Sequence, residues 1–178
     1  MKKYIALLRG MNVSGHKKIK MAELKELLKE IGFDDVQTYI QSGNVIFNAE
    51  PSKNSVLAEK IKVAIKRKFD FDVPVLVKNR EELQEIFDSN PIDEKVDIKN
   101  QYFILLGQNP AEEKINALNP SDYLPEEFFI TPSCVYLNCS NGYGNTKCNN
   151  NFFEQKLKVE ATTRNYKTLA NLLELSSK

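Results

Sequence analysis

The chain has 178 residues and a nearly balanced charge, with 25 Lys and Arg against 24 Asp and Glu and a formal net charge of +1. A dedicated nucleic-acid binder usually has a strong basic excess, so nucleic acid is not expected as the main partner, although a local basic patch stays compatible with this charge. No stretch approaches the ~20 apolar residues of a membrane span. We therefore expect a cytoplasmic protein without membrane contact.

The first half of the chain predicts the order strand, helix, strand, strand, helix, strand. Tyr4 to Leu8 is an almost continuous apolar run, typical of a buried strand. Apolar residues recur at helical spacing from Ala22 to Ile31, and Gly32 is a suitable stop. A polar turn at 41–44 then joins two short strands within Thr38–Phe47. A helix capped by Ser55, a strand at a sheet edge and a short helix follow at Ser55–Phe69, Val73–Val77 and Glu81–Phe87.

The second half repeats this order. The strand Tyr102–Gly107 resembles the run that begins at Tyr4, and both continue into a glycine. The further elements are expected at Ala111–Leu118, Glu127–Thr131, Cys134–Asn138, Phe152–Leu157, Val159–Thr163 and Tyr166–Leu175. The Asn- and Gly-rich segment from Asn138 to Asn151 is expected to be a long surface loop.

This pattern predicts an α+β fold built from two tandem ferredoxin-like (split βαβ) modules. We place the first module at residues 1–97, and the second, similar module with a terminal helix at residues 98–178. The charged and polar stretch from Pro91 to Asn100 would join them.

The topology brings polar side chains together. In a split βαβ unit, strands 1 and 2 run parallel with strand 3 between them, so the end of strand 1, the 41–44 turn and the start of the first helix share one edge. Six side chains are expected to converge there: Arg9, Asn12, Lys20, Gln41, Ser42 and Asn44. A guanidinium, amides and a helix N-terminus would suit a phosphate or carboxylate. The alternative is that these groups only tie loops together.

Two other segments offer weaker ligand groups. Thr163 and Arg164 precede the last helix, whose expected cap is Asn165, and the alternative to an anion-binding corner is an ordinary helix start with a surface arginine. Lys147 follows a Gly-x-Gly loop at Gly142 to Gly144, but the spacing is not that of a phosphate-binding loop. A flexible loop is the better interpretation, although Lys147 could still reach a ligand.

The residues do not reveal a reaction. The cysteines, Cys134, Cys139 and Cys148, are interpreted as reduced structural thiols, and no metal site or cofactor is expected because the only histidine, His16, is distant and no Cys-x-x-Cys pair exists. No Ser/His/Asp or Cys/His arrangement is recognisable. An enzyme of this sequence would work by positioning and electrostatic stabilisation.

Long strings resemble the bacterial domain of unknown function 1697 family. They are Tyr4–Val13, Lys20–Leu24, Tyr39–Val45 and Ala161–Thr168. The resemblance implies a cytoplasmic bacterial protein with a duplicated ferredoxin-like core, and it implies no activity. The family's motif positions match here at Arg9, Gly10, Asn12, Lys20, Gln41, Ser42, Gly43, Asn44, Thr163, Arg164 and Asn165. The chain departs from the family pattern at Tyr166, where the family usually has Trp, and at Asn145, where an Arg is usual.

The first functional hypothesis is therefore a cytosolic protein that binds a small anionic ligand, bearing phosphate or carboxylate, at the edge formed by strand 1 and the 41–44 turn. The alternative is a nucleic-acid or protein interaction module that uses the sheet surface or the lysine-rich segment 16–20. A third hypothesis is a scaffold whose paired modules mainly self-associate.

Overall fold

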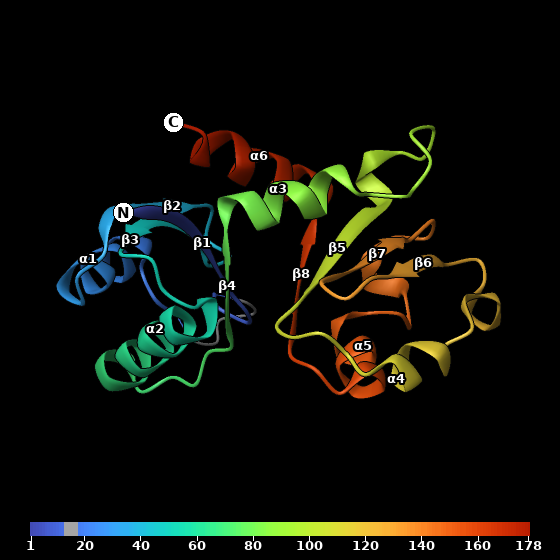
Figure 1. Ribbon diagram of the computed structural model, residues 1–178, viewed down its shortest axis with the longest axis horizontal. Coiled ribbons are helices and arrows are strands. Elements are labelled where there is room, and N and C mark those ends of the chain that lie inside the picture. The colour runs from blue at the N-terminus through green and yellow to red at the C-terminus, as the bar shows by residue number, and fades with distance from the viewer. Residues whose placement is uncertain (13–17) are drawn as a thin grey trace. The chain divides into compact units, whose positions relative to one another are not determined.

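The computed structural model describes residues 1–12 and 18–178, which form a mixed α+β fold with two four-stranded sheets. Within this described part, the six α-helices and eight strands follow one another as Figure 1 shows. The chain divides into two compact units, Met1–Gln84 with Leu172–Lys178, and Glu85–Asn171. The α+β class is thereby confirmed, and the module boundary between residues 97 and 98 stays a prediction. His16 lies outside the described residues.

The first unit holds one antiparallel sheet in the order β2-β3-β1-β4. Its elements are β1 (Lys2–Leu8), α1 (Met21–Glu30), β2 (Asp34–Tyr39), β3 (Asn44–Ala49), α2 (Asn54–Phe69), β4 (Val75–Asn79) and the start of α3 (Arg80–Asp88). Strand β4 lies at an edge of the sheet, as predicted from Pro74 near its start. The helix α2 begins after Lys53 without a side-chain cap, so the predicted Ser55 cap was wrong.

The core of the first unit explains the apolar run that begins it. Tyr4, Ala6 and Leu8 belong to one buried cluster with the inward faces of α1 and α2. Ile5 and Leu7 point to the opposite face of the sheet and are buried as well, at 0% exposure. A strand that is buried on both faces has no polar alternation, which is why its sequence is almost continuously apolar.

The second unit repeats this arrangement with the sheet order β6-β7-β5-β8. Its elements are the rest of α3, β5 (Gln101–Leu106), α4 (Glu112–Asn116), β6 (Glu127–Ile130), β7 (Cys134–Asn138), α5 (Asn150–Leu157), β8 (Ala161–Asn165) and most of α6 (Tyr166–Ser176). The segment after β7 is not simply a surface loop, because Cys139 and Cys148 are buried in the core cluster of this unit and Thr146 is buried as well.

The two sheets share their register as well as their strand order. Tyr4 pairs with Asn79 across β1 and β4, and Tyr102 pairs with Asn165 across β5 and β8. Equivalent backbone hydrogen bonds lie at the ends of the central strands in both units. The bond from Leu8 N to Gly43 O at 2.8 Å corresponds to that from Leu106 N to Ser133 O at 2.9 Å. The bond from Arg9 N to Pro74 O at 3.0 Å corresponds to that from Gly107 N to Glu160 O at 2.8 Å.

The last strand of each sheet is followed directly by a helix, and an asparagine caps the start of that helix. The Asn79 side chain accepts from the amide of Glu82 at 2.9 Å, and the Glu82 carboxylate accepts from the amide of Asn79 at 2.9 Å. The Asn165 side chain accepts from the amide of Thr168 at 2.8 Å. These bonds satisfy helix amides that the helix itself leaves without partners, and they confirm the predicted Asn165 cap.

Candidate functional site

The end of β1 and the turn between β2 and β3 meet at one corner of the first unit, as predicted. The amide of Leu8 donates to the carbonyl of Gly43 at 2.8 Å. Gly43 has φ +77, and a Cβ there would lie 2.8 Å from Leu8 Cβ and 3.2 Å from Leu8 O. Only glycine suits this position, because the turn needs both a left-handed backbone and a close approach to β1.

Asn12 ties the corner together. Its Nδ2 donates to the carbonyl of Ile19 at 3.0 Å and to the carbonyl of Gln41 at 2.9 Å, while its Oδ1 accepts from the amide of Ile19 at 3.0 Å. The residue has φ 54, a left-handed conformation that asparagine tolerates better than most residues. Both ends of this amide are occupied by backbone groups, so Asn12 positions the corner.

Asn44 and Ser42 have a similar internal role. Asn44 is 0% exposed, and its Nδ2 donates to Ser42 Oγ at 2.9 Å and to the carbonyl of Tyr39 at 3.2 Å. These bonds hold the turn that precedes β3. For Asn12 and Asn44, the structure therefore favours the alternative in which polar groups connect loops.

A surface depression of about 520 Å³ opens beside this corner, at the N-terminal end of α1. The described residues that line it are Asn12, Lys18, Ile19, Lys20, Glu23 and Gln41. Lys20 is the N-cap residue of α1 and makes no side-chain cap bond. The first-turn amides of an α-helix have no partner within the helix and form the positive end of its dipole. The depression thus combines two exposed lysines with a helix N-terminus.

The charge of the depression is not uniformly positive. Glu23 lies in the first turn of α1 and lines the same depression, where its carboxylate would repel an anion. Arg9 is half-buried, and its amide donates to the carbonyl of Pro74 at 3.0 Å. Arg9 is not among the described residues that line the depression.

Lys18 and Glu23, which line the depression, were not among the predicted ligand residues, although Lys18 belongs to the lysine-rich segment 16–20 of the alternative hypothesis. The usable signal was local, since Lys18 stands two residues before the helix cap and Glu23 three residues after it. Both residues therefore lie beside the start of α1, where either side chain could contact a bound ligand.

The three remaining predicted residues belong to the second unit. Thr163 lies within a hydrogen-bond chain, in which Tyr143 OH donates to Thr163 Oγ1 at 3.2 Å and Thr163 Oγ1 donates to Asn150 Oδ1 at 2.9 Å. Burial lowers the pKa of the Arg164 guanidinium to about 10, and its Nη1 donates to the carbonyl of Thr163 at 2.8 Å. Lys147 is exposed.

The thiols of the second unit are buried. Burial raises the pKa of the Cys139 thiol to about 12 and also raises the pKa of Cys148. Buried thiols with raised pKa values are poor nucleophiles and poor metal ligands. Among the described residues, no group of three or more His, Cys, Asp or Glu side chains is arranged to hold a metal ion. The helices of that same part of the chain include none with the length and apolar character of a membrane span.

Comparison with known proteins adds a family and a fold. The conserved bacterial protein SP0830 from Streptococcus pneumoniae has a solved structure with a TM-score of 0.78, 24% sequence identity and coverage of 100% of this chain and 99% of that chain. No curated protein matches the chain. The family model described as "Protein of unknown function (DUF1697)" matches residues 1–136. Since that match spans most of the chain, the protein belongs to the DUF1697 family.

Proposed function

We propose that this protein binds a small anionic ligand, bearing phosphate or carboxylate, in the depression at the N-terminus of α1. The observation that supports the proposal is the juxtaposition of Lys18 and Lys20 with a helix start that has no side-chain cap. Anions bind at helix N-termini because backbone amides point at them and the dipole is favourable there.

The neighbouring corner supports this site by fixing its walls. Asn12 holds Ile19 and Gln41 by three hydrogen bonds, and all three residues line the depression. A wall that is already ordered loses little conformational entropy when a ligand binds. Gln41, Ser42 and Asn44 thus support the ligand site mainly through the shape of the turn, while the lysines supply charge.

The proposal is tested with inorganic phosphate and citrate as probes, titrated into 15N-labelled protein. We expect the amide signals of Met21 to Glu23 to shift in a saturable way. Replacing Lys18 and Lys20 together by alanine should weaken binding by about fivefold to thirtyfold, since each exposed charge contribution is roughly 0.5–1 kcal/mol. Lys25→Ala on the same helix is the matched control, because Lys25 does not line the depression.

Glu23→Gln provides a test of opposite sign. Removing this carboxylate should tighten phosphate binding by about twofold to fivefold, because a like charge is removed from the site. Arg9→Ala reports whether the guanidinium also reaches the ligand. Unchanged phosphate binding in the variant without Lys18 and Lys20 would reject the proposed site. Retention of an RNA oligonucleotide at low salt, with no effect of phosphate, would favour the nucleic-acid alternative.

Two broader proposals accompany the site. We propose that each unit is a ferredoxin-like module and that the pair arose by duplication, supported by the common strand order and the matching strand-end bonds. We also propose a cytoplasmic location, which the three buried free cysteines support. Neither of these two proposals depends on the ligand site.

A further inference from the structure

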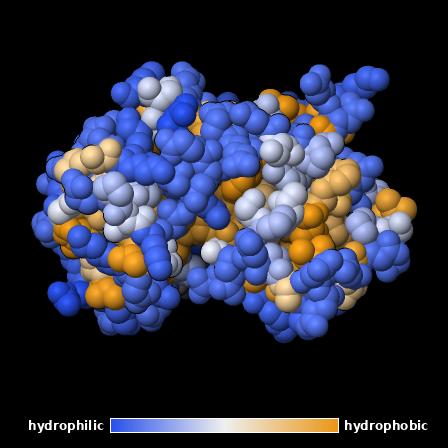
Figure 2. All heavy atoms as spheres, viewed as in Figure 1, coloured by the Kyte–Doolittle hydropathy of each residue, from blue (hydrophilic) through white to orange (hydrophobic). Residues whose placement is uncertain are grey.

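The outer face of α2 has an apolar stripe that the described residues of the first unit leave partly exposed. Val56 and Val63 lie seven residues apart and are 54% and 45% exposed. Together with Ile31 and Ala64 they line a groove of about 500 Å³ between the end of α1 and α2. Figure 2 shows hydrophobic patches among hydrophilic atoms in the region of α2. A seven-residue spacing of β-branched residues is typical of a helix face that meets another helix.

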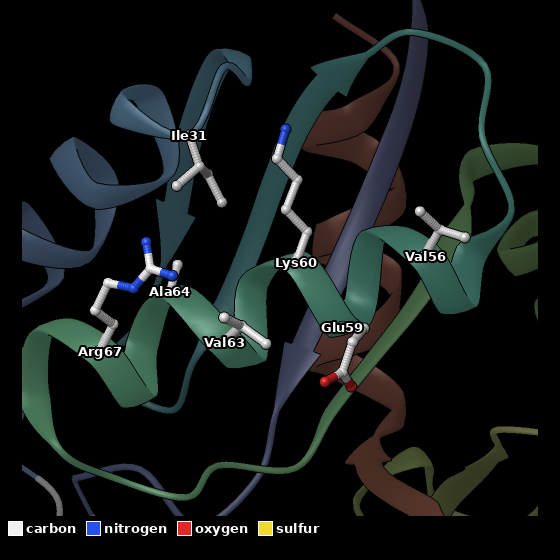
Figure 3. A pocket seen from close by; sticks show the side chains of 7 residues that line it. All are labelled: Ile31, Val56, Glu59, Lys60, Val63, Ala64 and Arg67. Atoms are coloured by element: carbon white, nitrogen blue, oxygen red, sulfur yellow. The ribbon is translucent and has the colours of Figure 1, made fainter.

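Cations flank this stripe. Lys60 and Arg67 line the groove, also seven residues apart, and make no ion pair with a described residue. Figure 3 shows both side chains reaching toward the side of Ile31, whereas Glu59, which also lines the groove, points to the opposite side of α2. Lys60 Nζ lies 5.0 Å from the ring centroid of Phe33, which holds the ammonium group at the edge of the groove.

From this face we infer a docking surface for an acidic amphipathic helix of a partner protein. Apolar side chains of the partner would enter the groove between Ile31, Val56 and Val63. Carboxylates seven residues apart would pair with Lys60 and Arg67, which are separated by about 10 Å along the axis at 1.5 Å per residue. This is recognition of an amphipathic helix in an apolar groove with complementary charge at its rim.

Charge and composition favour this occupant over three others. The groove is lined by two cations, Lys60 and Arg67, against one carboxylate, Glu59, so two copies of this face would bring like charges together. A membrane-surface helix usually presents Trp, Phe or Leu, whereas the exposed apolar residues of α2 are valines beside a groove. Single-stranded nucleic acid binds through exposed aromatic rings, and Phe33 is buried beneath Lys60.

The test uses a designed peptide of about three heptads, with apolar residues at the inner positions and Glu at the flanking ones, and a matched peptide in which Lys replaces every Glu. Fluorescence anisotropy measures affinity, and amide shifts of α2 locate the contact. We expect the Glu peptide to bind and the Lys peptide to fail. The double variant Lys60→Glu, Arg67→Glu should lose about tenfold or more in affinity, because two attractive charge pairs become repulsive.

The matched control is Lys62→Glu, a change of the same charge on the same helix. Lys62 points roughly 200° around the helix from Lys60 and does not line the groove. The affinity of the Lys62→Glu variant for the Glu peptide should therefore change less than about twofold. Val63→Asn, which keeps the net charge, should also weaken binding severalfold. Thermal unfolding verifies that each variant folds.

Four results would overturn the inference. They are equal binding of both peptides, unchanged affinity in the double variant, absence of binding at millimolar peptide, and shifts that fall outside α2. Binding of phosphatidylglycerol vesicles or of a single-stranded RNA through the same residues, without peptide binding, would reassign the surface to a lipid or nucleic-acid partner. Self-association that Lys60→Glu abolishes would reassign it to a second copy of the chain.

Discussion

Gly43→Ala is the most direct test of how the corner of the first unit is built. The methyl group would lie 2.8 Å from Leu8 Cβ and 3.2 Å from Leu8 O, and the backbone would have to keep φ +77. The added Cβ therefore destabilises the fold in two ways, through the left-handed backbone and through the close contact with Leu8. The left-handed backbone costs about 1–2 kcal/mol for a residue with a Cβ, and the forced contact with β1 costs about 1–3 kcal/mol more. We expect the free energy of unfolding to fall by about 2–5 kcal/mol in total.

Two other glycines separate these effects. Gly10 has φ +72 and open space around its Cβ position, so Gly10→Ala should lose only the backbone part, about 1–2 kcal/mol. Gly144 has neither a left-handed φ nor a neighbour within 4 Å, so Gly144→Ala should be nearly neutral or slightly stabilising.

Urea unfolding followed by circular dichroism gives the three free energies, provided that the slope against urea is unchanged among the variants. The reasoning about close approach would be refuted if Gly43→Ala and Gly10→Ala lost the same free energy within about 0.5 kcal/mol. An equal loss would mean that Leu8 moves aside at little cost, and the turn would then not be held at the end of β1 by contact.

Three further changes test separate parts of the fold. Asn165→Ala removes the bond to the Thr168 amide and should lower the free energy of unfolding by about 1 kcal/mol, while Asn165→Asp should restore most of it in the same urea assay. Tyr136→Phe leaves the Ile86 carbonyl without its 2.8 Å bond and should cost about 1–2 kcal/mol in thermal and urea unfolding; a loss near zero would show that water replaces the hydroxyl. Burial raises the pKa of Cys139 from 9.0 to about 12, so the stability it contributes is complete below pH 9 and is lost as the pH rises toward 12. Between pH 8 and pH 10 the wild type should therefore lose about 1 kcal/mol more than Cys139→Ala, and equal losses would contradict the raised pKa.

The sequence predicted the elements whose causes are local. The turn around Gly43, the helix stop at Gly32 and the Asn165 cap each depend on one residue and its immediate neighbours. Strand β1 was predictable because burial on both faces leaves an uninterrupted apolar run. The pairing of the strand end with the turn followed from the split βαβ order.

Other features depend on contacts that no local pattern encodes. The burial of Cys139 and Cys148 was not predictable, because the Asn- and Gly-rich composition of their segment is that of a surface loop. For the candidate site, the sequence predicted that the end of β1 and the 41–44 turn meet at one corner, and it could not assign the roles of the side chains there. An amide such as Asn12 is equally suited to a ligand and to a backbone carbonyl, and only its three bonds show that the backbone occupies it.

The bonds of Asn12 also link two walls of the depression through a single amide. Because this side chain holds the backbone of Ile19, just before α1, and the carbonyl of Gln41, in the β2–β3 turn, neither wall can shift without breaking a bond to Asn12. A displacement at the helix start is therefore transmitted to the turn, and a displacement of the turn to the helix start.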